Sequence, residues 1–552
     1  MKKSVIIVLI GLLPMAVQAQ KDSTLNRTVV VENEYNPTVM DASKINVLPK
    51  IAEPTVAKKA AEYATALRTV SMWDYEPMGA IEKRIQANNP SRGYFKAGYG
   101  NYGNVDLGVG YLWDPTNVDR LKVDLSLVGM NGDLHKVLNG NDGDWGSRHY
   151  TTDLSLIYNH LFSTVSLDLG GSFTNQVFNY MGFGHEENKP WTGQYRQHHT
   201  LGDVFARITS RDKDLPIQFM FQTGFQYFGQ KYATVNTDDT NEKKIHTVAG
   251  VWKPLNDEQT LGLDLGMDNL FYSNSVMHDY TSLLLNPYYT FNDDSWRIRL
   301  GAHVDWLSGD GGGVDVAPNV KAEYLFSDSY IFYVKADGGR QLNEFRYLNR
   351  ASRYWMIPVW LKPSYTQLDA TIGFRASPLN GLWFNVYGGY RIIKDESFGR
   401  LYLNGDEGLP TFASVIFLQD KAKIPYIGGE VKYGYKDLFE VNLSTSYFSW
   451  SINGIEGYED QNVLLGKVKY QLDLGARAKV FEGLHADAGF KYAKRCADFI
   501  TDVNDLHVGA EYEFIKNISA YAQIHNILNK EYDMIGYPQE QFNFIAGFKA
   551  RF

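Results

Sequence analysis

The sequence ends in FNFIAGFKARF, residues 542–552, and its last residue is Phe552. Phe and Ala occupy the even positions of this stretch, while Asn, Ile, Gly, Lys and Arg occupy the odd positions. Successive side chains of a β-strand point to opposite faces of its sheet, so the segment predicts a strand with one apolar face and one mostly polar, cationic face. A soluble β-sandwich also produces such alternation, and the rest of the chain has to distinguish the two.

The composition describes a large, aromatic-rich chain. Its 552 residues include 37 Tyr, 30 Phe, 11 Trp and 50 Gly, with a formal net charge of -9 and a single cysteine, Cys496. No stretch after the N-terminus offers the ~18 uninterrupted apolar residues of a membrane-spanning helix, which excludes a helical membrane protein. One cysteine cannot form an intramolecular disulfide, and the acidic balance disfavours nucleic-acid binding.

The N-terminus reads MKKSVIIVLIGLLPMAVQAQ, residues 1–20. Lys2 and Lys3 precede an apolar run, and small residues around Ala19 offer a cleavage site, as in a secretory signal peptide. An exported chain that is aromatic-rich and nearly free of cysteine indicates the envelope of a bacterium with two membranes. We therefore expect the protein in the cell outer membrane.

From residue 92 onward, short polar turns alternate with connections that are mostly longer. Ten short turns are read at 114–120, 161–164, 211–216, 255–259, 292–295, 327–329, 377–381, 435–439, 480–483 and 514–517. The eleven other connections include 131–149, 176–199, 234–244, 342–364 and 398–421. Ten turns alternating with eleven connections predict 22 strands.

The alternating strands indicate which face meets lipid. Trp296, Leu300 and Trp306 share one face of their strand, whereas Arg299 and Asp305 share the other. A barrel of 22 strands is too wide for side chains to fill with an apolar core, so the charged face must line the lumen and the apolar face must meet lipid. The sequence therefore predicts an all-β transmembrane protein, an antiparallel outer-membrane β-barrel of about 22 strands with a short extended N-terminal segment.

A family resemblance enters at the C-terminus. HNILNKEYDMIGYPQEQFNFIAGFKARF, residues 525–552, resembles the C-terminal signature of TonB-dependent receptors, with matches at Asn526, Ile527, Leu528, Asn529, Lys530, Tyr532, Gly536, Tyr537, Pro538 and Phe552. The resemblance implies that Phe552 is the C-terminal barrel signal. It also implies nutrient or solute uptake and a TonB-type energising protein as a partner.

The chain departs from that family before its first strand. Residues 1–20 are expected as the signal peptide, 21–91 as a periplasmic or lumenal extension and 92–552 as the barrel. A complete receptor carries a globular plug ahead of the barrel, and 21–91 does not read as a compact domain. It is either an extension that orders against the barrel or a partner, or a much reduced plug. Within it, Val29, Val30, Val31 and Glu32 resemble a TonB box.

The connection Leu342–Ser364 is the most unusual segment outside the strands. It combines aromatic and arginine side chains, the residue types enriched at binding surfaces. Its candidate ligand or partner contacts are Tyr347, Arg350, Arg353, Tyr354, Trp355 and Trp360. The alternative is that this connection folds into the lumen or over its neighbours and buries its own aromatic side chains.

The sequence offers little chemistry beyond binding. We expect no enzyme, because no catalytic motif is present, and no cofactor or metal site. His485 and His507 share the predicted lumenal face of adjacent strands beside Asp487 and Glu511, where a hydrated polar network is the expected reading.

Three functions remain open at this point. The barrel acts in nutrient or solute uptake, or as the barrel subunit of a surface complex. It is alternatively an accessory or structural subunit of an outer-membrane assembly or secretion complex that contacts a surface lipoprotein or another outer-membrane protein. The third reading is a passive porin.

Overall fold

The computed structural model describes residues 91–552 apart from 139–140, 184–195, 213, 233–239, 274–275, 310–311, 328, 358–359, 405–410 and 499. The expected signal peptide, the N-terminal segment up to residue 90 and the TonB-box-like run at Val29–Glu32 therefore lie outside the described residues.

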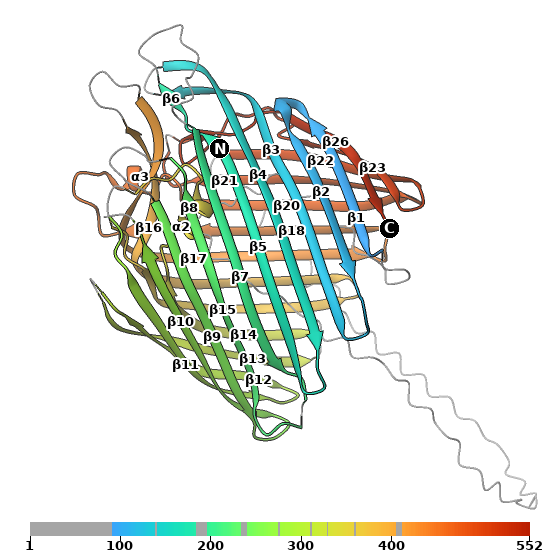
Figure 1. Cartoon of the computed structure of the whole chain (residues 1–552), viewed down its shortest axis with the longest axis vertical. Coiled ribbons are helices and arrows are strands. Elements are labelled where there is room, and N and C mark those ends of the chain that lie inside the picture. Colours follow the sequence, from blue (N-terminus) through green and yellow to red (C-terminus); the bar gives the residue numbers. More distant parts are fainter. Residues whose placement is uncertain are drawn as a thin grey trace, which may run out of the picture. The chain divides into compact units, whose positions relative to one another are not determined.

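Antiparallel strands form one continuous sheet that closes on itself (Figure 1). Two of the 24 described strands in this sheet, β6 (Gly182–Phe183) and β19 (Ser451–Ile452), are short pieces that pair only with β17. The other 22 form the barrel, as the sequence predicts. They are β1 (Gly93–Gly100), β2 (Val105–Trp113), β3 (Asp119–Leu138), β4 (Asn141–Leu161), β5 (Val165–Asn179), β7 (Arg196–Ser210), β8 (Gln218–Gln230), β9 (Thr240–Pro254), β10 (Gln259–Tyr272), β11 (Tyr280–Asn292), β12 (Trp296–Leu307), β13 (Gly313–Ser327), β14 (Tyr330–Gln341), β15 (Ser364–Leu379), β16 (Leu382–Asn404), β17 (Thr411–Tyr435), β18 (Phe439–Phe448), β20 (Val468–Phe481), β21 (Leu484–Arg495), β22 (Val503–Ile515), β23 (Ile518–His525) and β26 (Asn543–Arg551).

Few other elements are described. A two-stranded hairpin, β24 (Asp533–Met534) with β25 (Tyr537–Pro538), lies in the last connection. The helical segments are a 3-10 turn, η2 (Asn101–Gly103), and the α-helices α2 (Phe345–Ala351) and α3 (Asp460–Val463). Neither described α-helix is long and apolar enough to cross a membrane.

The last strand closes the barrel against the first. β26 pairs with β1 from Tyr94 opposite Arg551 to Gly100 opposite Ile545. Phe552 extends this pairing, because its backbone N–H and carbonyl both bond to Gly93 at 3.0 and 2.8 Å. Phe548 is 60% exposed, whereas Ile545 is 3% exposed. The alternation in the last strand therefore separates an outer apolar face from the lumen, while the role of Phe552 as a barrel signal stays a prediction.

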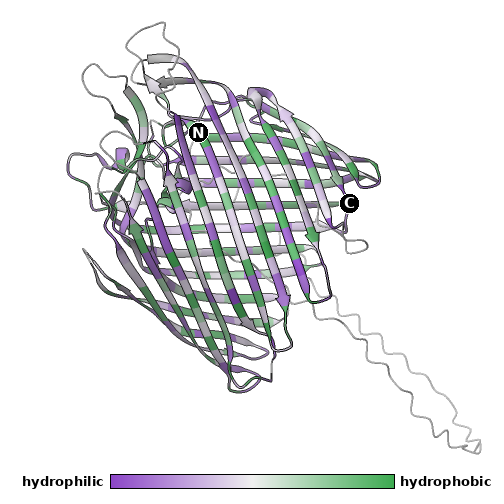
Figure 2. Cartoon of the chain, in the orientation of Figure 1, coloured by the Kyte–Doolittle hydropathy of each residue, from purple (hydrophilic) through white to green (hydrophobic). Residues whose placement is uncertain are grey.

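The same alternation runs along the other strands (Figure 2). In β12, Trp296, Leu300 and Trp306 are exposed on the outer face, while Asp305 is buried on the lumenal face. An apolar outer face suits hydrocarbon, and a polar inner face suits water or a folded insert.

All ten expected short turns lie between consecutive barrel strands, at the end of the barrel that also holds Gly93 and Arg551.

The prediction of two of the longer loops is wrong. Segments 131–149 and 398–421 are largely paired strands, because β3 and β4 stay in register from Asn131 opposite Arg148 to Leu138 opposite Asn141, and β16 pairs with β17 as far as Asn404. Where a hairpin extends beyond the apolar band, its strands stay paired through backbone hydrogen bonds but no longer alternate apolar and polar residues. The sequence pattern therefore did not reveal these strands.

Candidate functional site

The connection between β14 and β15 turns into the barrel and is anchored there at the start of α2. The carboxylate of Glu242 in β9 accepts the backbone N–H of Phe345 at 2.6 Å. Glu344, the residue before the helix, pairs with Lys244 of the same strand at 2.5 Å. The first turn of a helix leaves backbone N–H groups without partners, so Glu242 satisfies one of them and fixes the helix to the barrel wall.

The apolar side of this connection is buried. Phe345 and Leu348 are 0% exposed and Trp355 is 1% exposed. The rings of Phe345 and Trp355 both contact Phe228 of β8, with centroids 5.9 and 5.6 Å away. Of the two alternatives for segment 342–364, the structure therefore favours inward folding with burial of its aromatic side chains.

The same connection also reaches β17. Val415 donates its backbone N–H to the carbonyl of Tyr354 at 2.7 Å, and Met356 donates to the carbonyl of Val415 at 2.8 Å. In the barrel order, β17 lies far around the wall from β8. The connection is therefore held from both sides of the lumen.

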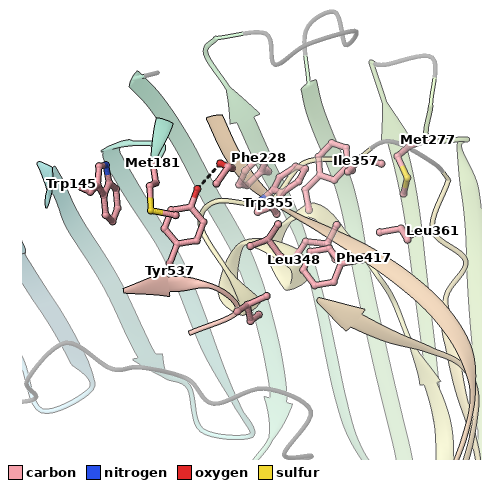
Figure 3. Close-up of a cluster of buried hydrophobic side chains, with 14 of the residues drawn as sticks. Trp145, Met181, Phe228, Met277, Leu348, Trp355, Ile357, Leu361, Phe417 and Tyr537 are labelled. Carbon is pink, nitrogen blue, oxygen red and sulfur yellow. Dashed lines mark hydrogen bonds between the residues drawn. The ribbon is translucent and has the colours of Figure 1, made fainter. Parts of the chain in front are cut away.

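The last connection, residues 526–542, completes this arrangement. The hydroxyl of Tyr537 donates to the carbonyl of Ala413 in β17 at 2.6 Å (Figure 3). The ring of Tyr537 stacks on that of Tyr354. We call the resulting apolar core the mouth cluster. Its buried residues are Met130, Leu134, Trp145, Met181, Phe228, Met277, Phe345, Leu348, Trp355, Ile357, Leu361, Ala413, Val415, Phe417, Ile535 and Tyr537.

A cavity of about 330 Å³ lies beside the mouth cluster. Its wall comes from β3, β4 and Gln176 of β5, from residues 349–354 within and after α2, and from residues 534–540 of the last connection. Arg350 and Arg353 line it together with His149 of β4. Two connections and the barrel wall therefore enclose one space that the chain builds from three distant segments.

Some polar atoms that line this cavity have hydrogen-bond partners and others have none. Nη1 of Arg353 and Nδ1 of His149 are buried without a hydrogen-bond partner. The two acids in the lining already accept bonds, Asp153 from Thr174 at 2.5 Å and Glu540 from Asn104 at 3.0 Å. Nη1 of Arg353 is a donor in every protonation state, whereas Nδ1 of neutral His149 donates or accepts according to its tautomer, so the arginine nitrogen is the group that matches a ligand with acceptor oxygens.

Burial shifts the titration of two groups at the edge of this cavity. Desolvation raises the pKa of the Glu540 carboxyl because burial disfavours the charged form. Burial likewise raises the pKa of the Tyr354 hydroxyl, so this tyrosine stays neutral at physiological pH. Burial therefore favours the neutral form of both groups.

The predicted contact residues divide into two groups. Trp355 lies inside the mouth cluster, and Tyr347, Tyr354 and Trp360 pack partly buried against it. Arg350 and Arg353 line the cavity instead. Their role in ligand or partner contact stays a prediction.

Sequence reasoning missed His149, Phe228 and Glu540 as members of this site. The sequence singled out Tyr537 only as one residue of the C-terminal family signature, not as a member of this site. As expected, His485 and His507 lie in adjacent strands, with His485 opposite Glu511; His507 lies opposite Gly489.

No protein-family model and no curated protein matches the sequence. Solved structures do match. The FrpB iron transporter from Neisseria meningitidis (F3-3 variant) is 10% identical with a TM-score of 0.64, covering 84% of this chain and 82% of that one. The copper transporter OprC is 11% identical with a TM-score of 0.62, covering 84% and 80%.

The ferric-catecholate import receptor Fiu from E. coli K12 is 11% identical with a TM-score of 0.60, covering 84% of this chain and 82% of that one. These neighbours are TonB-dependent receptors. At such low identities the likeness establishes the fold alone. The chain has the 22-stranded outer-membrane barrel fold of TonB-dependent receptors.

Proposed function

We propose that this barrel takes up a solute across the outer membrane, with the mouth cluster as its barrier and the adjacent cavity as its binding site. The observation that carries the proposal is the inward-folded connection between β14 and β15, which is anchored on β9 by Glu242 and on β17 by Val415. An apolar cluster held across the lumen obstructs free diffusion. A solute must displace it, or part of it, to pass.

An unpartnered arginine nitrogen in the cavity supports a solute with carboxylate or phosphate oxygens. Nη1 of Arg353 is buried without a hydrogen-bond partner. Charge-assisted bonds from arginine to such oxygens are stronger than neutral ones and select planar acceptors. The fold likeness to iron and copper transporters supports uptake as the class of function.

Two alternatives receive less support. A passive porin needs an open lumen, whereas this one carries the mouth cluster. A docking subunit would use exposed aromatic side chains of segment 342–364, but Trp355 is buried and Tyr347, Tyr354 and Trp360 are partly buried. A TonB-type partner and a surface lipoprotein partner both stay proposals.

Conductance of the purified full-length chain in planar lipid bilayers tests the barrier. We expect little steady conductance from the wild type. Trp355→Ala removes a large ring from the mouth cluster and should open the barrel. Replacing a buried Trp with Ala typically lowers the free energy of unfolding by about 3–5 kcal/mol. Tyr458→Ala removes an exposed ring from connection 449–467 and should leave conductance unchanged.

A large steady conductance of the wild type would support the porin instead. A closed barrel that binds no solute and copurifies with a surface protein in a fixed ratio would support the accessory subunit.

A further inference from the structure

Three side chains converge on the barrel wall outside the cavity. Asp505 and His507 lie in β22, and His525 ends β23. Each offers one ligand atom, and the three atoms lie within 4.8 Å of one another. In the described part of the chain, no other group of three or more His, Cys, Asp or Glu side chains has this spacing.

All three side chains are on the lumenal face. Val508 and Tyr512 of β22 are exposed on the outer face, so the odd positions of this strand point inward. The register pairs Val508 with Ile524, which places His507 opposite His525. Their imidazole rings accordingly stack, with centroids 5.2 Å apart and planes 16° apart.

The distances in this group differ from those of an ordinary ion pair. Nδ1 of His525 and Nδ1 of His507 lie 3.4 and 3.8 Å from the same Oδ2 of Asp505. Charge-assisted hydrogen bonds are shorter, about 2.7–2.9 Å. Elsewhere in the barrel, His246 approaches Asp268 to 2.6 Å, which shows the closer contact that the pair at Asp505 does not make.

A shared metal ion accounts for this spacing. Bonds of about 2.0–2.2 Å from imidazole nitrogen and carboxylate oxygen to one ion reproduce the two separations at angles of roughly 110° and 130° at the ion. These angles lie near and somewhat above the tetrahedral value. Both distances from Oδ2 of Asp505 to an imidazole nitrogen are therefore compatible with one shared ion.

The atoms that face one another make one long hydrogen bond, between Nδ1 of His525 and Oδ2 of Asp505 at 3.4 Å, which a shared ion would replace. Oδ1 of Asp505 accepts the backbone N–H of Asn526 at 2.6 Å, which leaves Oδ2 toward the imidazoles. Nδ1 of His507 is buried without a hydrogen-bond partner. Gly489 of β21 makes room for this ring, because a methyl group at that position would collide with its Nε2. The neighbouring backbone thus holds both ligands in place.

The nearby charges favour a cation. Lys491 of β21 lies opposite Asp505, and Asp473 of β20 lies opposite Lys491. With both imidazoles neutral, two carboxylates and one ammonium group leave this part of the lumenal face with a net negative charge.

We propose that Asp505, His507 and His525 bind a divalent first-row transition-metal ion. Imidazole nitrogen and carboxylate oxygen suit zinc and its neighbours in the series, and three protein ligands leave a further position for water or for a donor atom of a solute in the lumen. The ion would join β22 to β23 beside the last connection. This site does not depend on the solute-uptake proposal, because neither histidine lines the cavity.

Zinc titration of the purified full-length chain in detergent, after removal of metal with a chelator, tests the site. We expect one equivalent to bind the wild type by calorimetry and to raise its Tm. His507→Ala, His525→Ala and Asp505→Asn should each weaken zinc binding at least about 10-fold. Loss of even an outer partner of a metal ligand commonly weakens binding by that factor.

His246→Ala is the matched control, because it removes a lumenal imidazole that also faces a carboxylate. Heat-modifiable mobility on gels should show that every variant still forms the barrel. The proposal is overturned if the wild type binds no zinc, or if His507→Ala binds zinc as tightly as His246→Ala does. Zinc binding that survives all three ligand substitutions would also overturn it. Conductance measured on the same samples reports separately on the mouth cluster.

Discussion

The ring of Tyr354 lies parallel to that of Tyr537, with centroids 3.7 Å apart and planes at 6°. One ring belongs to the connection after β14 and the other to the connection before β26. This stack joins two residues that are 183 positions apart in the sequence, and Tyr537 in turn bonds to Ala413 of β17. The connection after β14, the connection before β26 and strand β17 therefore meet at Tyr537.

Substitution of Tyr537 should loosen the mouth cluster, and the increase in bilayer conductance should depend on how much of the side chain is removed. Tyr537→Phe keeps the stacked ring and loses one neutral hydrogen bond, worth about 1 kcal/mol, so bilayer conductance should stay close to that of the wild type. Tyr537→Ala loses the stack as well and should raise conductance several-fold. Equal conductance of the wild type and Tyr537→Ala would show that this stack does not contribute to the barrier.

Removal of the Arg353 charge, whose Nη1 has no hydrogen-bond partner, should weaken anion binding in the cavity. Arg353→Gln keeps much of the side-chain length but loses the charge, and bonds to charged groups contribute about 1.5–3 kcal/mol. Citrate and inorganic phosphate serve as probes in calorimetry, and we expect affinity for at least one of them to fall about 10-fold or more. Arg297→Gln is the control, since that side chain is half exposed in β12 outside the cavity. A loss that is equal in both variants would indicate a general charge effect rather than a site.

Most of the barrel was predictable because its signals are local. A two-residue period assigns each strand its lipid face, and short polar turns such as 514–517 mark where a strand reverses. These signals recovered the 22 strands and all ten short turns. They failed in 131–149 and 398–421, where paired strands continue without an apolar face.

The site was not predictable for a different reason. Glu242 and Phe345, or Ala413 and Tyr537, are joined by contacts across more than 100 residues that no local period encodes. The register of the strands is equally non-local. Sequence reasoning placed His485 and His507 on the lumenal face of adjacent strands, but only the register shows that His507 lies opposite Gly489 and next to His525.

Charge on the lipid face should destabilise the barrel more than charge on the lumenal face. Leu474→Arg in β20 puts a cation into hydrocarbon, which costs about 2–4 kcal/mol near the bilayer midplane. Gln471→Arg, three residues earlier in the same strand, faces the lumen and should cost much less. Unfolding in lipid vesicles by denaturant measures both. Equal losses would mean that the two faces of β20 are assigned wrongly.

The single thiol should react slowly. Burial raises the pKa of Cys496 to about 11 from an ordinary 9.0. Because the thiolate is the reactive form, its alkylation at neutral pH should be about 100-fold slower than that of an exposed thiol and should still rise above pH 9. Maleimide labelling of the wild type is compared with Tyr458→Cys in a Cys496→Ser background. Similar rates at pH 7 would show that Cys496 is not shielded.

Deletion of Val29–Glu34 distinguishes energised from unenergised uptake. This run resembles a TonB box, and the resemblance implies a TonB-type energising partner. In our proposal the barrier is the mouth cluster, whose residues all lie after position 129. We therefore expect the deletion to leave solute accumulation by whole cells intact. Surface labelling and heat-modifiable mobility confirm that equal amounts of barrel are assembled. If accumulation is abolished while assembly stays normal, the barrel is driven by a TonB-type partner, and the mouth cluster is a gate that this partner opens.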